Sequence, residues 1–149
     1  MLADEKVALG VRAFRCVRMT PAQVDADSVL ADNGKGTPRV LILNPAKPEK
    51  VKVLEAKDLK ASKLFKAMKS TSNKFWKQKL DKVVKTHMSL LTEQDQLANA
   101  EKTISDKLAR VGDDDKKAKK VKEEQAEIRA QLKEIKDKEL ELWKLTRKA

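Results

Sequence analysis

Cysteine, aromatic residues and long apolar runs are all scarce in this chain of 149 residues. It contains one cysteine, so an internal disulfide and any Cys-x-x-Cys redox or zinc motif are excluded. Aromatic residues make up 3% of the chain and charged residues 38%, which is too polar for one compact core and typical of long solvated helices. We therefore expect a small domain of about 70 residues joined to an extended helical part.

Targeting and membrane signals are also missing. No apolar run approaches the roughly 18 residues of a membrane span, and the opening Met1–Glu5 stretch does not resemble a signal peptide. The sequence as written therefore predicts a cytoplasmic protein, and an earlier start would leave the compartment open.

Catalytic and metal-binding patterns are missing as well. The sequence shows no Ser/His/Asp arrangement, no P-loop and no dinucleotide-binding glycine motif. Its paired carboxylates alternate with lysine at spacings that give ordinary ion pairs on helices. We expect no catalytic residue, no metal and no cofactor, and enzymatic activity is left open.

A buried strand is predicted by the aliphatic run Val40 to Leu43, which shows no polar alternation and so needs cover on both faces. Pro38 stands just before it, where its missing N–H costs no ladder hydrogen bond. A turn at 45–50 then leads to Val51–Glu55, a second strand close enough to pair antiparallel with the first. These features predict a β-hairpin.

Two elements are expected before the hairpin. The β-type residues of 11–19 predict a strand, in which Cys16 points with Phe14 into the core as an inert thiol. Thr20 caps a following helix that has Pro21 at its first position and Gln23 placed for a capping box. This helix is expected to end near Asp32, and its likeliest inward residues are Val24, Val29 and Leu30.

An amphipathic helix is expected after Asp58, because apolar residues recur there at helical spacing, namely Ala61, Leu64, Phe65 and Met68. The small polar cluster at 70–73 is interpreted as the separator between two domains. The predicted domains are therefore an incomplete α/β module at 1–72 and a helical hairpin at 73–149.

The helical hairpin is predicted from two helices, at Lys74–Val111 and Lys116–Arg147, whose apolar residues recur every seven positions. A turn at 112–115 separates them. If they fold back on each other, four apolar layers coincide: Val83 with Leu142, Leu90 with Ile135, Leu97 with Ile128, and Ile104 with Val121. This register predicts an antiparallel coiled coil. It also places His87 opposite Glu139, as a polar layer, and Trp143 beside Val83 and Val84.

The order of elements resembles the C-terminal part of the thioredoxin fold over roughly residues 5–69, and the residues that carry the likeness are Gly36-Thr37-Pro38-Arg39-Val40-Leu41-Ile42-Leu43. The resemblance implies that Pro38 is cis and that Thr37 contacts a bound peptide. The family's central strand and Cys-x-x-Cys helix are missing. Either the protein starts earlier, or another chain supplies the strand, or the sheet is reduced; the first is favoured because the opening residues look like the end of a helix.

The positive charge is concentrated in the middle third, where residues 45–92 hold 13 lysines against 4 acidic residues. Part of it forms a candidate basic patch: Lys63, Lys66, Lys69, Lys74, Trp76 and Lys77. Such a run is usually a solvated face. Its alternative role is to follow a phosphate backbone, although arginine, the usual residue for bidentate phosphate contacts, is missing there.

Three functional hypotheses remain open at this stage. The first is a noncatalytic protein-interaction module, in which the helical hairpin binds another protein or a second copy of itself. The second is the C-terminal part of a thiol-disulfide oxidoreductase whose catalytic cysteines lie upstream. The third is a basic nucleic-acid-associated protein. No membrane partner is expected.

Overall fold

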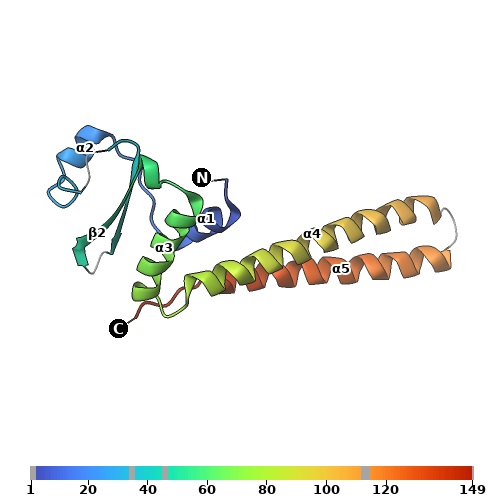
Figure 1. The fold of residues 1–149 in the computed structure, drawn as a ribbon. Coiled ribbons are helices and arrows are strands. Elements are labelled where there is room, and N and C mark those ends of the chain that lie inside the picture. The colour runs from blue at the N-terminus through green and yellow to red at the C-terminus, as the bar shows by residue number, and fades with distance from the viewer. Residues whose placement is uncertain (1–2, 34–35, 45–46, 112–114, 149) are drawn as a thin grey trace. The chain divides into compact units, whose positions relative to one another are not determined.

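The computed structural model describes residues 3–33, 36–44, 47–111 and 115–148 (Figure 1). It is mostly helical and contains a small two-stranded sheet. The elements in order are α1 (Glu5–Gly10), η1 (Val11–Ala13), α2 (Pro21–Asp25), β1 (Arg39–Asn44), β2 (Lys47–Glu55), η2 (Ala56–Asp58), α3 (Ala61–Phe75), α4 (Leu80–Val111) and α5 (Asp115–Leu142). They form two compact units, residues 1–84 with 145–149 and residues 85–144.

The predicted β-hairpin is confirmed. Strands β1 and β2 pair antiparallel, with Val40 opposite Leu54 and Leu41 opposite Val53. The expectation that both faces of the first strand are covered is wrong, because only Ile42 of β1 is buried. Helix α3 packs against β1, and in the described residues the sheet has no third strand.

The strand predicted at 11–19 is wrong. Residues 11–13 form the short 3-10 helix η1, and residues 14–20 have no regular structure. The three arginines at 12, 15 and 18 fall at every third position, so each face of a strand would carry arginine and neither face would be wholly apolar. Cys16 is exposed rather than buried, and its neighbour Val17 is 71% exposed.

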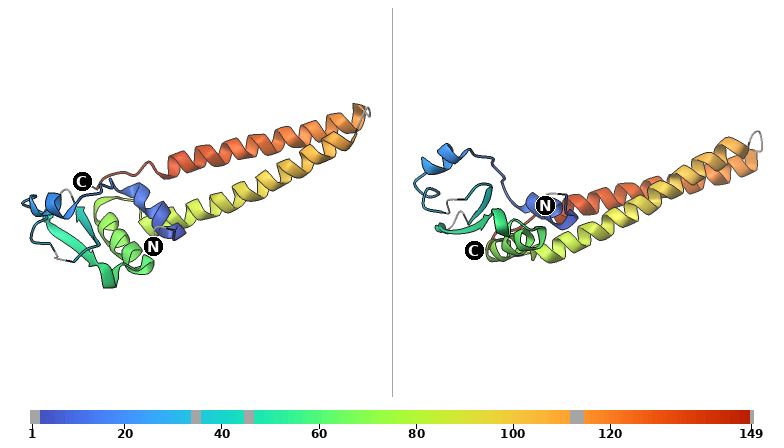
Figure 2. Two further views of the ribbon diagram at one scale, coloured as in Figure 1. Left: turned by 90° about the horizontal axis from the view of Figure 1, so that it is seen from above. Right: turned by 45° about the horizontal axis from the view of Figure 1, so that its top comes forward.

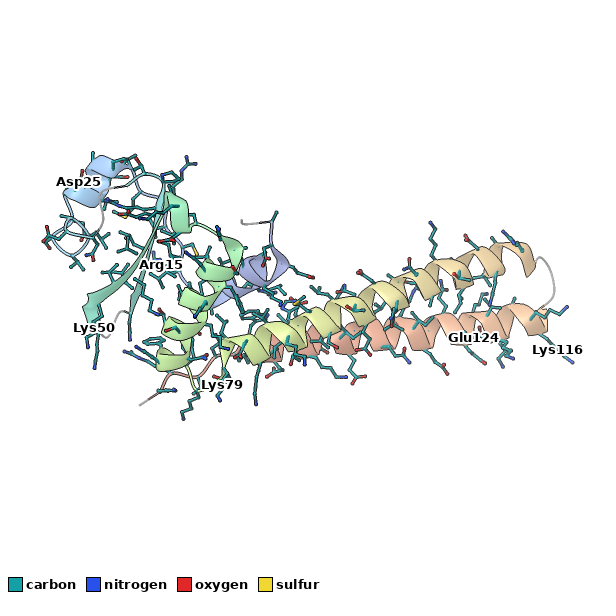
Figure 3. The ribbon with its side chains drawn as sticks, in the orientation of Figure 1. Arg15, Asp25, Lys50, Lys79, Lys116 and Glu124 are labelled. Carbon is teal, nitrogen blue, oxygen red and sulfur yellow. The ribbon has the colours of Figure 1, made fainter. Side chains whose placement is uncertain are left out.

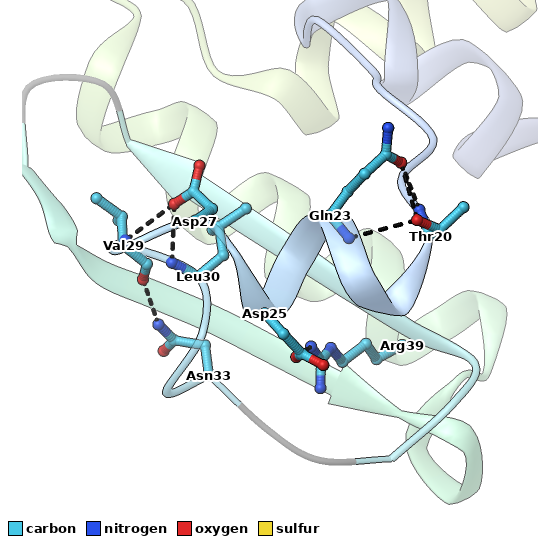
Figure 4. Close-up of polar contacts among 8 residues, drawn as sticks. All are labelled: Thr20, Gln23, Asp25, Asp27, Val29, Leu30, Asn33 and Arg39. Atoms are coloured by element: carbon cyan, nitrogen blue, oxygen red, sulfur yellow. Dashed lines mark hydrogen bonds and ion pairs between the residues drawn. The ribbon is translucent and has the colours of Figure 1, made fainter.

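The capping box predicted at Thr20 is confirmed (Figure 4). The Thr20 hydroxyl accepts a hydrogen bond from the Gln23 amide at 3.3 Å, and the Gln23 side-chain oxygen accepts one from the Thr20 amide at 2.8 Å. Helix α2 nevertheless ends at Asp25, seven residues earlier than expected.

A local carboxylate explains this early end. Oδ1 of Asp27 accepts hydrogen bonds from the amides of Val29 and Leu30 at 2.9 and 3.1 Å, and this turn competes with helical pairing of the same backbone (Figure 4). Val24 and Leu30 are buried as predicted, whereas Val29 is 39% exposed. Arg39 of β1 forms an ion pair with Asp25 of α2 at 3.6 Å.

Helix α3 carries much of the core of its unit. Its residues Leu64 and Met68 are buried as predicted, and α1, whose Val7 is 0% exposed, packs against it. Gly10 allows this close approach, because a Cβ there would lie 2.9 Å from Cε of Met68. The separator expected at 70–73 lies inside α3, where residues 71 and 72 are buried.

The C-terminal segment is not helical up to Arg147 as predicted. It leaves α5 at Leu142 and pairs with the residues that follow α3. The Lys77 amide donates to the Thr146 carbonyl at 2.8 Å, and the Lys148 amide donates to the Phe75 carbonyl at 2.9 Å. Residues 76–79 are therefore extended or bent, and α4 starts at Leu80 rather than at residue 74.

Helices α4 and α5 form a long antiparallel pair, and Figure 2 (left) shows them closest where α4 ends and α5 begins and further apart away from there. Polar contacts join them at successive heights: Gln125 Nε2 donates to Ser105 Oγ at 3.1 Å, and Arg129 Nε lies 2.7 Å from Glu101 Oε1. The matching of the four apolar layers stays a prediction, and residues 112–114 of the expected turn lie outside the described residues.

Of the eight layer residues, Val83, Ile104 and Ile135 are buried. The other five are half-buried, namely Leu90, Leu97, Val121, Ile128 and Leu142. The seam is thus only partly closed by the partner helix.

No helix in the described part of the chain combines the length and the apolar character needed to cross a membrane.

Candidate interaction surfaces

An open groove lies between α4 and α5, where Figure 2 (left) shows the two helices diverging away from the ends at Val111 and Asp115. Its volume is about 590 Å³. The residues that line it are Thr86, Leu90, Glu134, Asp137, Lys138, Glu141 and Leu142. Leu90 and Leu142 are half-buried, so the groove offers apolar surface inside a charged rim.

Carboxylates dominate the rim of this groove, with three against one ammonium group. Lys138 Nζ lies 2.8 Å from Glu134 Oε1. This hydrogen bond lowers the pKa of Glu134 and raises the pKa of Lys138. Glu141 forms an ion pair with Lys144, one turn further along the chain. The lining residues still carry more negative than positive charge, in a protein whose net charge is +11.

A buried polar cluster joins the same two helices. His87 is 1% exposed, and its Nε2 lies 3.3 Å from Glu139 Oε1, which confirms the predicted pairing of these residues. The Trp143 indole N–H donates to His87 Nδ1 at 2.7 Å. Because an indole can only donate, Nδ1 carries no proton, and Nε2 is the nitrogen that donates to Glu139. Sequence reasoning did not find this contact with Trp143.

Among the described residues, some lysines of the predicted basic patch form ion pairs, and others do not. Lys63 lies 2.5 Å from Asp58, and Lys69 lies 2.8 Å from Asp81, so two of its lysines have carboxylate partners. Lys66, Lys74 and Lys77 are exposed. Trp76 is half-buried and packs edge-to-face on Phe75 at 4.6 Å. Lys79 follows, and Figure 3 shows it projecting away from the ribbon.

Three further cations join this patch from distant parts of the chain. Lys52 of β2 donates to the Ser70 hydroxyl at 2.5 Å, and Lys148 donates to the Asn73 carbonyl at 2.6 Å. The Arg147 guanidinium lies 4.8 Å from the centre of the Phe75 ring, a cation–π contact. No local sequence signal could have placed these residues here, because they meet α3 only through tertiary pairing.

The pair between Lys69 and Asp81 predicts a pH effect. The hydrogen bond from Lys69 lowers the pKa of Asp81 below its ordinary value of 3.8. A lowered folded-state pKa stabilises the fold above pH 3.8, and this contribution is lost as the pH falls through the folded value. We expect Asp81→Asn to cost less than about 1 kcal/mol at neutral pH, since both side chains are partly exposed.

Denaturant titrations of the Asp81→Asn variant and the unsubstituted protein at several pH values test this prediction. The difference in the free energy of unfolding should be largest near neutrality and should shrink below about pH 4. A difference that grows on acidification would contradict the assignment.

The loop that carries the resemblance to thioredoxin is exposed at Thr37 and Pro38. The Thr37–Pro38 peptide bond is cis, as the resemblance implies.

Within the described residues, no group of three or more His, Cys, Asp or Glu side chains is arranged to hold a metal ion. Searches against protein-family models, curated proteins and solved structures found no match to this chain.

Proposed function

We propose that this protein is a noncatalytic protein-interaction module whose helix pair works as an antiparallel coiled-coil hairpin. Its binding site is the groove between α4 and α5, and its partner is an amphipathic helix with basic flanks. The observation that carries the proposal is the composition of the groove, with half-buried Leu90 and Leu142 inside a rim where carboxylates outnumber cations.

The physical case rests on apolar area that the two helices leave uncovered. A helix laid along a groove buries its own apolar stripe against the groove lining, which is a recurrent mode of recognition. The charges at the rim then select the partner, because placing like charges together is costly and opposite charges speed association. The carboxylates Glu134, Asp137 and Glu141 favour lysine or arginine beside the partner's apolar stripe.

The unit formed by residues 1–84 and 145–149, which we call the α/β unit, serves as the scaffold in this proposal. The hairpin β1–β2 and the packing of α3 on β1 support the idea that residues 36–75 form a thioredoxin-like ββα part. A thiol-disulfide enzyme would require a cysteine pair that this sequence does not contain. Cys16 lies exposed on an irregular segment and adds nothing to that alternative.

Two designed helical peptides with the same leucine pattern test the site, one flanked by lysines and the other by glutamates. We expect the lysine-flanked peptide to bind at least about tenfold tighter, which corresponds to about 1.4 kcal/mol. Isothermal titration calorimetry gives both affinities, and sedimentation equilibrium shows whether a second copy of the chain competes for the groove.

Charge reversal localises the binding. Glu134→Lys combined with Asp137→Lys should remove the preference for the lysine-flanked peptide. The control is Glu127→Lys, an exposed carboxylate on α5 that does not line the groove. If neither peptide binds, or if both bind equally to every variant, the proposed site is wrong.

A further inference from the structure

A stripe of basic side chains runs along α3, in the unit that does not contain the groove. Lys63, Lys66, Ser70 and Lys74 share one side of this helix, since they are spaced three or four residues apart. The Ser70 hydroxyl binds Lys52 of β2, which adds another ammonium group between Lys66 and Lys74. From Lys63 to Lys74 the stripe extends about 17 Å at 1.5 Å per residue.

Two more cations lie at the last turn of α3, where Lys148 donates to the Asn73 carbonyl and the Arg147 guanidinium lies over the Phe75 ring. Lys63 is paired with Asp58 and is left out of the count. The remaining five cations define what we call the α3 basic row: Lys52, Lys66, Lys74, Arg147 and Lys148.

The part of the row that lies on α3 has no acidic residue near it in the sequence. Between Asp58 and Asp81 the sequence has seven lysines and no acidic residue, and the carboxylate of Asp81 is taken by Lys69. Like charges gathered on one face repel one another and raise the potential of that face. A polyanion bound along the row would relieve this repulsion and release its own counterions.

We propose that the α3 basic row binds the phosphate backbone of single-stranded nucleic acid without reading its sequence. A linear row of cations matches a linear polyanion, and half-buried Trp76, between Lys74 and Lys77 in sequence, offers an aromatic ring to an unstacked base. This inference does not depend on the groove of the helix pair.

An anionic membrane is the less favoured ligand. Surface binding to lipid uses exposed apolar side chains next to the cations. The large apolar side chains that are exposed in the described residues are Val17, Met19, Val29 and Leu140. None of these lies on α3 or on the segment that carries Arg147 and Lys148.

Fluorescence anisotropy with a labelled oligothymidine tests the proposal on the full chain. The dissociation constant should rise steeply between about 50 and 200 mM salt, with a slope of log K against log salt near −0.7 for each phosphate contacted. The triple variant Lys66→Gln, Lys74→Gln, Lys148→Gln should bind at least about tenfold more weakly and lose about two units of slope.

The matched control removes three exposed lysines from α5, in the variant Lys116→Gln, Lys119→Gln, Lys120→Gln. It makes the same change in net charge and should alter affinity less than about twofold if the site is local. Arginine at the same three positions, 66, 74 and 148, keeps the positive charge and should leave binding within about twofold of the unsubstituted chain. Equal losses in both triple variants, tighter binding to a duplex of the same length, or stronger competition by phosphatidylserine vesicles would each overturn the proposal.

Discussion

Replacing His87 by alanine is expected to lower the free energy of unfolding of the helix pair by about 2–4 kcal/mol. The substitution leaves a cavity where an imidazole with 1% exposure now lies. It also removes the acceptor of the Trp143 indole N–H and the donor to Glu139. A polar group that loses its partner away from water costs more than the bond contributed, so the two losses act together.

Single-tryptophan fluorescence measures this effect. In a Trp76→Phe background, Trp143 reports on its own unit during thermal and denaturant unfolding. His87→Gln is the matched control, because an amide can both accept from the indole and donate to Glu139. We expect it to recover a substantial part of the lost stability. If the alanine and glutamine variants unfold together, restoring side-chain volume and both polar groups recovers nothing, and the assignment of the loss to the cavity and the two contacts is wrong.

Local signals in the sequence predicted the elements that form from neighbouring residues. Thr20 and Gln23 are three residues apart, and their reciprocal hydrogen bonds need nothing from the rest of the chain. The β-hairpin joins two aliphatic runs through a short connection. The antiparallel helix pair was predictable for a similar reason, because a shared spacing of seven residues on both sides of a turn admits few registers.

Two predictions failed because tertiary context overrides local preference. Small polar residues favour turns, so Ser70 to Asn73 were predicted to form a linker, yet residues 71 and 72 are buried within α3. Residues 143–147 were predicted to be helical, yet Arg147 forms an isolated β-bridge with Trp76. In both cases a partner that is distant in sequence determines the conformation, and the residues of the segment itself do not indicate that partner.

The candidate surfaces divide in the same way. The lysines of α3 were visible in the sequence because they are close together on one helix. Lys52, Arg147 and Lys148 were not, since they join the row only through the packing of β2 and the return of the C-terminal segment. The groove depends on how far two helices diverge, which a heptad pattern does not specify.

Leu80→Ala is expected to cost the α/β unit about 2–5 kcal/mol, a large share of the stability of a small domain. Leu80 is 1% exposed, and it begins α4 with its amide donating to Asn73 Oδ1 at 2.9 Å. A small unit has few other buried side chains with which to refill the cavity. In a domain of this size the loss should lower Tm by more than about 10 °C.

The control for this prediction makes the same chemical change at the surface. Leu140 is 64% exposed, so Leu140→Ala removes little buried area and should change stability by less than about 0.5 kcal/mol. The fluorescence of Trp76, in a Trp143→Phe background, measures the unfolding of Leu80→Ala. The fluorescence of Trp143, in a Trp76→Phe background, measures the unfolding of Leu140→Ala. Comparable shifts in the two would mean that Leu80 is not a core residue. A selective loss at Leu80 would show that the fold of the α/β unit depends on the first turn of α4 as well as on α1 and α3.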